Sequence, residues 1–173
     1  MILKGYIMFK KIAIAATLSL LASSSFAAAP IYAGADFGST KIQDISDRSS
    51  SYGVFIGYKF HENFAIEGSF RRLADFDFTV GTASGNETVD QTALSVIGSL
   101  PLASGFNLYA RLGYNRLKAK ASISGFNADD STSGGLYGVG MGYTFSPTVS
   151  ARLEVQKPSR DSTNVHAGVV FNF

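Results

Sequence analysis

The chain of 173 residues has no cysteine and only two histidines. Without cysteine, no disulfide framework can staple an exported chain. The sequence also has no charge run, tandem repeat or low-complexity linker, so nothing in it marks a second domain. These absences, together with a length that suits one domain, predict a single folded unit.

Long apolar runs are also missing, apart from one near the N-terminus. Ile12–Ala22 is apolar but only about half as long as a helix that spans a bilayer. Lys10 and Lys11 precede it and small residues follow it, which is the order of parts in a secretory signal peptide. We therefore expect residues 1–27 to be removed after export and residues 28–173 to form the mature domain.

The signal peptide also accounts for the positive charge of the whole sequence. The formal net charge is +2, and loss of residues 1–27 leaves 12 basic against 13 acidic residues, a net charge of −1. The mature domain therefore has no basic excess that would indicate a nucleic-acid partner. The true start is either Met1 or Met8, of which Met8 gives the tighter opening Met-Phe-Lys-Lys.

Beyond the signal peptide, polar and apolar residues alternate with a period of two, and no helical periodicity competes with it. Eight segments show the alternation, each of roughly 9–12 residues, the length of a tilted membrane-crossing strand. They are Ile31–Ser39, Ser51–Phe60, Phe64–Leu73, Gln91–Pro101, Phe106–Leu117, Gly135–Phe145, Val149–Lys157 and Thr163–Phe173.

The connections between these segments alternate in length. Three are tight, at residues 61–63, 103–105 and 146–148, and four are longer and polar, at residues 40–50, 74–90, 118–134 and 158–162. In an up-and-down barrel, alternate connections lie at the same end. One end therefore has short turns and the other carries loops, as in outer-membrane barrels.

The alternation does not say which face points outward. A soluble ligand-binding barrel would turn the apolar face inward, and a membrane barrel would turn it toward lipid. Two features favour lipid: glycine is frequent on the polar face, where it would make room inside a narrow lumen, and aromatic residues gather near the short turns, as at a membrane interface. These aromatic residues are Tyr58, Phe60, Phe64, Tyr143, Phe145, Phe171 and Phe173. The predicted fold is all-β, an eight-stranded antiparallel up-and-down transmembrane β-barrel.

The last eight residues support this prediction. They place His166, Gly168, Phe171 and Phe173 in a polar-x-Gly-x-x-aromatic-x-aromatic pattern. The pattern resembles the C-terminal signal strand of bacterial outer-membrane barrels, which the barrel-assembly machinery recognises. An edge strand that happens to end in Phe is the alternative.

Four short motifs add a family resemblance. Ile31–Ala35, Asn107–Gly113, Gly140–Pro147 and Ala151–Gln156 resemble strands of the outer-membrane protein A family and its small single-barrel relatives. The resemblance covers essentially all of residues 30–173. It implies a location in the bacterial outer membrane, and the periplasmic peptidoglycan-binding domain of larger members is not seen in the sequence.

The same family has a Glu–Arg pair inside the barrel, described as a gate to a water-filled path. Glu67 and Arg152 match that pair, and Arg111 and Glu154 match neighbouring members of its internal network. A second Lys–Glu pair of the family is replaced here by Ile97 and Gly142, which puts a straightforward transfer of the gate in doubt.

The residues themselves give a separate reason to expect an interior network. Glu67, Arg71, Arg111, Arg152 and Glu154 lie on the polar face and are nearly balanced in sign. A buried ion needs a partner or water, because its desolvation costs several kcal/mol. We favour a packed salt-bridge network that fills the lumen, and a narrow passive channel for ions or small solutes is the alternative.

No pattern indicates an enzyme, a metal site or a cofactor. His61 falls in a short turn and His166 on the lumen face, and neither has the spacing of a catalytic group. The expected function is a structural or surface-interaction role of a monomer, with host or surface ligands bound by the loops. The expected partners are the lipid bilayer and lipopolysaccharide. Its phosphates would meet Arg116, Lys118 and Lys120 at the loop end of the fifth segment. A solvated hairpin arm is the alternative for these three cations.

Overall fold

The computed structural model describes residues 30–42, 48–80, 83–123 and 126–173. The chain separates into two compact units, and the larger, Pro30–Asn172, contains all of the described strands. The other unit consists of residues 1–29 and Phe173. The expected signal peptide lies outside the described residues, so its removal stays a prediction.

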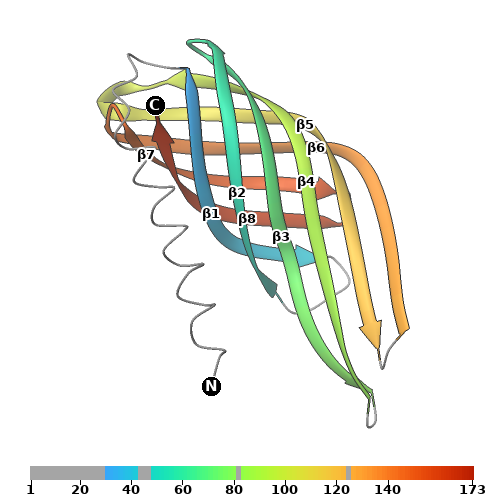
Figure 1. Cartoon of the computed structure of the whole chain (residues 1–173). Coiled ribbons are helices and arrows are strands. Elements are labelled where there is room, and N and C mark those ends of the chain that lie inside the picture. Colours follow the sequence, from blue (N-terminus) through green and yellow to red (C-terminus); the bar gives the residue numbers. More distant parts are fainter. Residues whose placement is uncertain (1–29, 43–47, 81–82, 124–125) are drawn as a thin grey trace, which may run out of the picture. The chain divides into compact units, whose positions relative to one another are not determined.

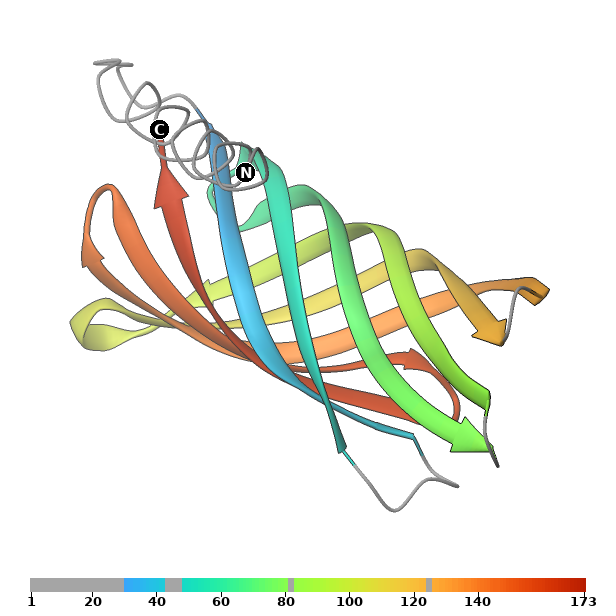
Figure 2. The same ribbon diagram turned by 60° about the horizontal axis from the view of Figure 1, so that its bottom comes forward.

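The larger unit is a closed barrel in which each strand is antiparallel to the next and β1 also pairs with β8 (Figures 1 and 2). The predicted fold class is confirmed. A short 3₁₀ turn, η1 (Ala103–Gly105), connects β4 to β5. The strands are β1 (Ile31–Ile42), β2 (Arg48–His61), β3 (Phe64–Val80), β4 (Ala83–Pro101), β5 (Phe106–Ile123), β6 (Phe126–Ser146), β7 (Val149–Ser159) and β8 (Ser162–Asn172).

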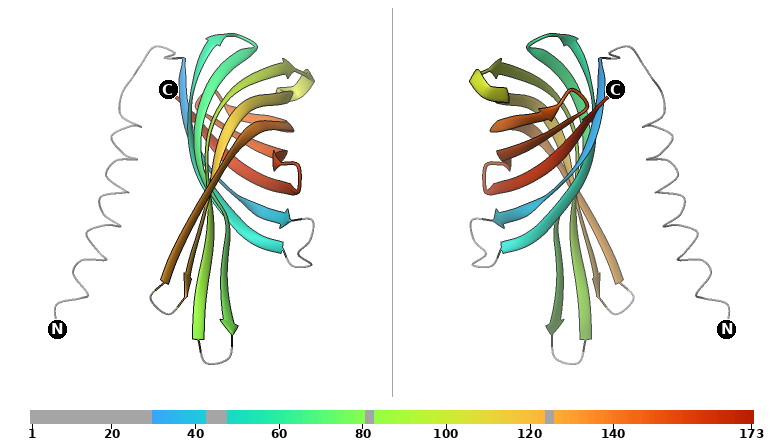
Figure 3. Two further views of the ribbon diagram at one scale, coloured as in Figure 1. Left: turned by 90° about the vertical axis from the view of Figure 1, so that its right-hand side faces the viewer. Right: turned by 90° about the vertical axis from the view of Figure 1, so that its left-hand side faces the viewer.

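Two of the predicted long loops are wrong over most of their length. β3 and β4 continue through most of residues 74–90, and β5 and β6 continue through most of residues 118–134. Their polarity indicates contact with water, and it does not prevent the backbones from pairing across each hairpin. Figure 3 shows both hairpins extending past the ends of the other strands.

A third predicted loop, residues 158–162, is a two-residue turn. β7 reaches Ser159 and β8 begins at Ser162, so only Arg160 and Asp161 lie between them. The predicted strand stopped before Pro158, because proline has no N–H to donate to a β-ladder. In the structure Pro158 lies where the β7–β8 register shifts, between Gln156 and Ser159. β1 and β2 likewise extend into the predicted loop 40–50.

The apolar set of the alternation faces outward. Leu112 is 69% exposed and Val139 64%, whereas Glu67 is fully buried and Arg111 is 2% exposed. An apolar exterior around a polar interior is the arrangement of a lipid-embedded barrel, and it contradicts the alternative of a soluble ligand-binding barrel. The part of the chain that the structure describes contains no helix with the length and hydropathy to cross a membrane.

Exposed aromatic residues form two rings, of which the sequence analysis predicted one. The predicted ring follows the short turns, with Phe106 as an additional member. The second ring lies near the other end of the apolar surface and comprises Phe37, Tyr52, Phe70, Tyr114 and Tyr137. On β5 the two rings, marked by Phe106 and Tyr114, are about 26 Å apart along an extended strand. Rings at both edges of an apolar band are typical of the two interfaces of a bilayer.

Candidate functional site: the charged lumen

Inward-facing side chains from four strands meet at the centre of the lumen. They are three carboxylates and three guanidinium groups, all buried, and we call them the ion network. Its members are Asp36 on β1, Glu67 and Arg71 on β3, Arg111 on β5, and Arg152 and Glu154 on β7. Three charges of each sign leave the network with no net charge, which is what a low-dielectric interior requires.

Arg111 is the centre of the larger part of this network. Its Nε donates to Glu154 Oε1 at 2.6 Å, and one terminal nitrogen donates to Glu67 Oε1 at 2.8 Å and to Glu154 Oε2 at 3.0 Å. Arg152 approaches Glu67 from another side, with 2.7 Å between Nη1 and Oε2. Each carboxylate therefore has a charge-assisted donor, which offsets the desolvation of both ions.

Two tyrosines each donate a further hydrogen bond to one carboxylate of the network, and both do so across a glycine on the strand between them. Tyr32 lies beside Gly57 in the register, and Gly57 lies beside Glu67; the Tyr32 hydroxyl donates to Glu67 Oε2 at 3.0 Å. A Cβ at Gly57 would overlap the Tyr32 ring, so the glycine lets tyrosine cross its strand.

The second row consists of Tyr109, Gly140 and Glu154. Tyr109 pairs with Gly140, Gly140 pairs with Glu154, and the Tyr109 hydroxyl donates to Glu154 Oε2 at 3.0 Å. A Cβ at Gly140 would overlap the Tyr109 ring. The barrel thus uses one Tyr-Gly-Glu arrangement twice, and each copy fixes one carboxylate of the ion network.

Arg71 and Asp36 form the smaller part of the network. Arg71 Nε and Nη2 donate to the two oxygens of Asp36 at 3.0 and 2.7 Å, a bidentate pair. Arg152 Nη2 lies 3.6 Å from Asp36 Oδ2 and so connects the two parts. The face of the Arg152 guanidinium stacks on Phe55, with Cζ 3.4 Å from the ring centroid. Arg152 is therefore held by two carboxylates and an aromatic ring.

His166 lies against this network without a catalytic geometry. Its Nε2 is 3.1 Å from Arg71 Nη2, and an arginine can only donate, so Nε2 accepts. Nδ1 then carries the proton and donates to Asn164 Oδ1 at 2.8 Å. Both ring nitrogens are occupied, and no serine or threonine hydroxyl is hydrogen-bonded to the ring among the described residues. The arrangement fills space and binds Arg71.

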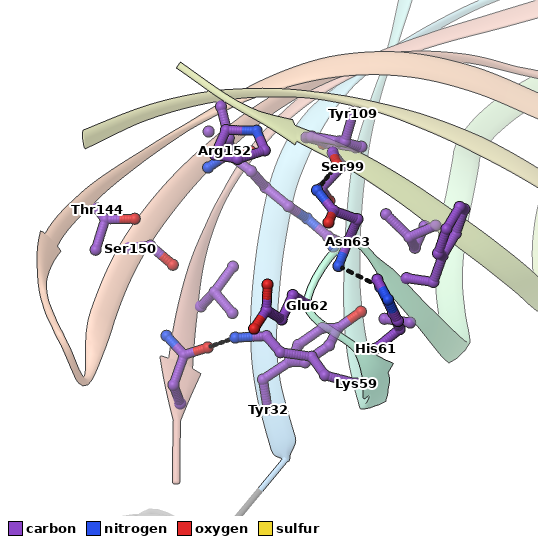
Figure 4. Close-up of a pocket in the computed structure, with 18 of the residues that line it drawn as sticks. Tyr32, Lys59, His61, Glu62, Asn63, Ser99, Tyr109, Thr144, Ser150 and Arg152 are labelled. Atoms are coloured by element: carbon purple, nitrogen blue, oxygen red, sulfur yellow. Dashed lines mark hydrogen bonds between the residues drawn. The ribbon is translucent and has the colours of Figure 1, made fainter. Parts of the chain in front are cut away.

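A cavity of about 320 Å³ lies at the short-turn end of the lumen, and we call it the well. Figure 4 shows several of its lining side chains, with Lys59 beside the Tyr32 ring and Arg152 among the residues drawn. Arg152, Tyr32 and Tyr109 line the well and also contact the ion network. The well therefore ends where the network begins.

All five charged residues that the sequence analysis proposed for the lumen lie together in this network. Asp36, Tyr32 and Tyr109 were not named as members, although their inward position in the alternation was the available signal. Ile97 and Gly142, which stand where the resembled family has its second ion pair, also face inward, at the well. Of the C-terminal pattern, Gly168 pairs with Asp36 and Phe171 faces outward, while Phe173 follows the end of β8.

No group of three or more His, Asp or Glu side chains in a position to hold a metal ion occurs in residues 30–42, 48–80, 83–123 and 126–173. The carboxylates of the ion network are already bound by guanidinium groups and tyrosine hydroxyls. What the arrangement does chemically is to hold balanced charge in a rigid lumen.

Residues 13–173 match the model of the family described as the outer membrane protein beta-barrel domain. Comparison with curated protein sequences gives no match.

Solved structures with the same fold are similar over most of the chain. Neisserial surface protein A has a TM-score of 0.66 at 16% identity, over 86% of this chain and 100% of that one. The N-terminal barrel of OprF from Pseudomonas aeruginosa has a TM-score of 0.61 at 18% identity, over 84% and 99%. Ail, the attachment invasion locus protein of Yersinia pestis, in complex with the heparin analogue sucrose octasulfate, has a TM-score of 0.58 at 18% identity, over 83% and 96%. At these identities the likeness shows the fold.

Proposed function

The chain belongs to the outer membrane protein beta-barrel domain family, and we propose that it serves in the outer membrane as a closed scaffold that presents a β-sheet for surface interaction. The scaffold is monomeric, and its activity is binding, without enzymatic chemistry. Residues 1–27 direct export and are removed, and the barrel-assembly machinery reads the strand that ends at Phe173.

The observation that carries this proposal is a sheet that projects beyond the barrel. β3 has no β2 partner past Arg72, and β6 has none on β7 before Tyr137, within the described residues. β4 and β5 stay paired as far as Gly85 and Ile123. The outer parts of β3, β4, β5 and β6 thus form a four-stranded sheet with two unpaired edges, which we call the projecting sheet. Unpaired strand edges offer backbone donors and acceptors to a partner.

The projecting sheet also carries charge just beyond the second aromatic ring. Tyr114 belongs to that ring, and Arg116, Lys118 and Lys120 follow it on the same face of β5. Lys118 pairs with Asp129 at 2.8 Å and Arg116 donates to Ser131, so Lys120 is the cation with most freedom for an external anion. Lipopolysaccharide phosphates lie just beyond the apolar band of an outer-membrane barrel, at the level of these cations. Lipopolysaccharide is therefore the proposed lipid partner.

The test is a shortened hairpin. Residues 119–130 are replaced by Asn-Gly, which joins Lys118 to Ser131, two residues that face each other in the ladder. Protein in lipid nanodiscs is then titrated with purified lipopolysaccharide and with sucrose octasulfate, the ligand in the Ail structure. We expect weaker binding of both polyanions by the shortened protein and by Lys120→Gln.

A matched control changes a cation far from the projecting sheet, Lys59→Gln at the short-turn end. The control should bind like the unchanged protein. Equal binding by all proteins would contradict a surface role of the projecting sheet. Migration of unboiled protein on a denaturing gel verifies that each variant forms the barrel.

A narrow passive channel is the second candidate, and the well is the observation that favours it. The well would form the short-turn end of a path through the lumen, and the ion network would be the barrier in that path. We expect only small and rare conductance in planar bilayers. Steady large pores would overturn the scaffold proposal, and an increase in conductance in Glu67→Ala would support a gate at the network.

A further inference from the structure

The lining of the well changes from its inner end to its mouth. The inner lining is apolar and buried: Ala65, Ile97, Val170 and the rings of Tyr32 and Tyr109 all line the well and form one cluster with Phe55. The mouth is polar, with Lys59 and Glu62 near the β2–β3 turn and the amides of Asn63, Asn107 and Asn172. Such a cavity suits a ligand with an apolar body and a polar head.

Lys59 is the cation available to such a head. Its Nζ donates to Asn172 Oδ1 at 2.7 Å and lies 5.7 Å from the centre of the Tyr32 ring. An ammonium group has three N–H donors, so two remain. Arg152 also lines the well, but its terminal nitrogens are bound to Glu67 and lie near Asp36. Arg152 therefore closes the inner end, and the charge that meets a ligand is that of Lys59.

Asn107 supplies a second uncommitted polar group. Its side-chain amide makes no hydrogen bond within the part of the chain that the structure describes, and it lies over Gly142, where an added Cβ would be 2.7 Å from it. Glycine at this position therefore leaves the amide room to face the well. Among the described residues that line the well, Glu62 is the one acidic side chain, and it opposes an anionic head.

We propose that the well binds a small monocarboxylate with an apolar body from the periplasmic side of the barrel. The apolar body packs among Ala65, Ile97 and Val170, and the carboxylate accepts hydrogen bonds from Lys59 and Asn107. The site is closed at its inner end by Arg152 and the ion network, so the ligand enters and leaves by the same mouth. The volume of about 320 Å³ is at the lower end of ligand pockets, which limits the ligand to a small one. The proposal does not depend on the surface role of the projecting sheet.

The chain length of the ligand is the first test. Butanoate, hexanoate and octanoate are titrated against the protein in lipid nanodiscs, and backbone and methyl NMR signals are followed. Each methylene that leaves water should strengthen binding about fourfold until the well is full. Saturable shifts are expected at Ala65, Ile97 and Val170, and none at Val139 on the outer face. Shifts that are larger at Val139 would show partition into the lipid and overturn the proposal.

The head group is the second test. Hexanoate is compared with hexylamine and 1-hexanol, which keep the apolar body and change the charge. Lys59→Gln should weaken hexanoate binding at least fivefold and leave 1-hexanol unchanged, whereas Glu62→Gln should strengthen hexanoate binding. Lys157→Gln, on β7 away from the well, is the matched control and should bind like the unchanged protein. Equal affinity for the three ligands, or unchanged affinity in Lys59→Gln, would overturn the carboxylate assignment.

A filled well is the third test. Ser150 lines the well from β7, and Ser150→Phe would place a ring in it. Migration of the unboiled protein on a denaturing gel verifies that Ser150→Phe is folded. The folded variant should show no saturable NMR shifts when hexanoate is added. Saturable binding that persists in this variant would place the site elsewhere and contradict the proposal. If Ser150→Phe does not fold, Ser150→Leu gives the same test with a smaller side chain.

Discussion

The centre of the lumen and its short-turn end are built from the same strands, yet one is filled and the other is hollow. At the centre, alternate inward positions carry long charged side chains that reach across the barrel, such as Arg111 to Glu67 and Glu154. At the short-turn end the inward positions carry small or medium side chains, including Ala65, Ser99 and Ser150, and a cavity remains. Both regions belong to one eight-stranded barrel. The length of the inward-facing side chains therefore decides where along the barrel axis the lumen is closed.

The largest effect is expected from loss of Arg111. Arg111→Ala would leave Glu67 and Glu154 each without a principal partner at the buried centre. Removal of one member of a buried ion pair costs roughly 3–5 kcal/mol, because the remaining charge stays desolvated. Equilibrium unfolding in urea from lipid vesicles, followed by circular dichroism, measures the free energy of unfolding.

The control for this prediction is Arg116→Ala on the same strand, with its side chain outside the lumen. We expect it to change the free energy of unfolding by less than about 1 kcal/mol. Similar losses in both variants would show that the central network is no more important to stability than a surface arginine.

A smaller loss is expected when the crossing of Tyr109 is blocked. Gly140→Ala puts a Cβ where the ring now lies, and overpacking of this kind costs roughly 1–3 kcal/mol. Gly68→Ala is the matched control, since no heavy atom lies within 4 Å of the added Cβ. An equal cost at both positions in the same unfolding experiment would contradict the close approach of Tyr109 to Gly140.

The two Tyr-Gly-Glu rows should respond alike to a still smaller change. Tyr32→Phe and Tyr109→Phe each remove one hydroxyl that donates at 3.0 Å to a buried carboxylate. A hydrogen bond to a charged group contributes roughly 1.5–3 kcal/mol. We expect each loss to fall near the lower end of that range, because both carboxylates keep their arginines. A difference of more than about 1 kcal/mol between the variants would break the equivalence of the rows.

The smallest effect is expected at the exposed pair of Lys118 and Asp129. Lys118→Ala should lower the free energy of unfolding less than any of the changes above, because the pair is exposed on both sides. The remaining effect should shrink at high salt. A loss as large as that of Arg111→Ala would remove the distinction between the lumen and the projecting sheet.

The alternation of side chains predicted the barrel because lipid outside and a polar lumen inside impose a period of two on every crossing strand. It also placed Glu67, Arg111 and Arg152 on the inner face. It could not tell which ions meet, since Arg71 and Asp36 are brought together by the register of strands far apart in sequence. The projecting sheet was missed for another reason: its strands leave the apolar band, so the contrast between their two faces weakens.

The well was beyond sequence analysis altogether. The well exists because small side chains from several strands lie at the same level along the barrel axis. Only the strand register shows which residues share that level. The second aromatic ring is an intermediate case. Tyr114 and Tyr137 lie on the apolar face of the alternation, but their common height follows from strand pairing.

The central claim is that the ion network closes the lumen above the well, and cysteine accessibility tests it most directly. The chain has no native cysteine, so a single substitution gives an unambiguous signal. Ser150→Cys lines the well, and Ser95→Cys lies beside Glu67 in the register and is 2% exposed. With a water-soluble thiol reagent and folded protein in nanodiscs, we predict rapid labelling of Ser150→Cys and at least a hundredfold slower labelling of Ser95→Cys. Labelling of both cysteines at similar rates would show that water and solutes pass the network, and would contradict the claim.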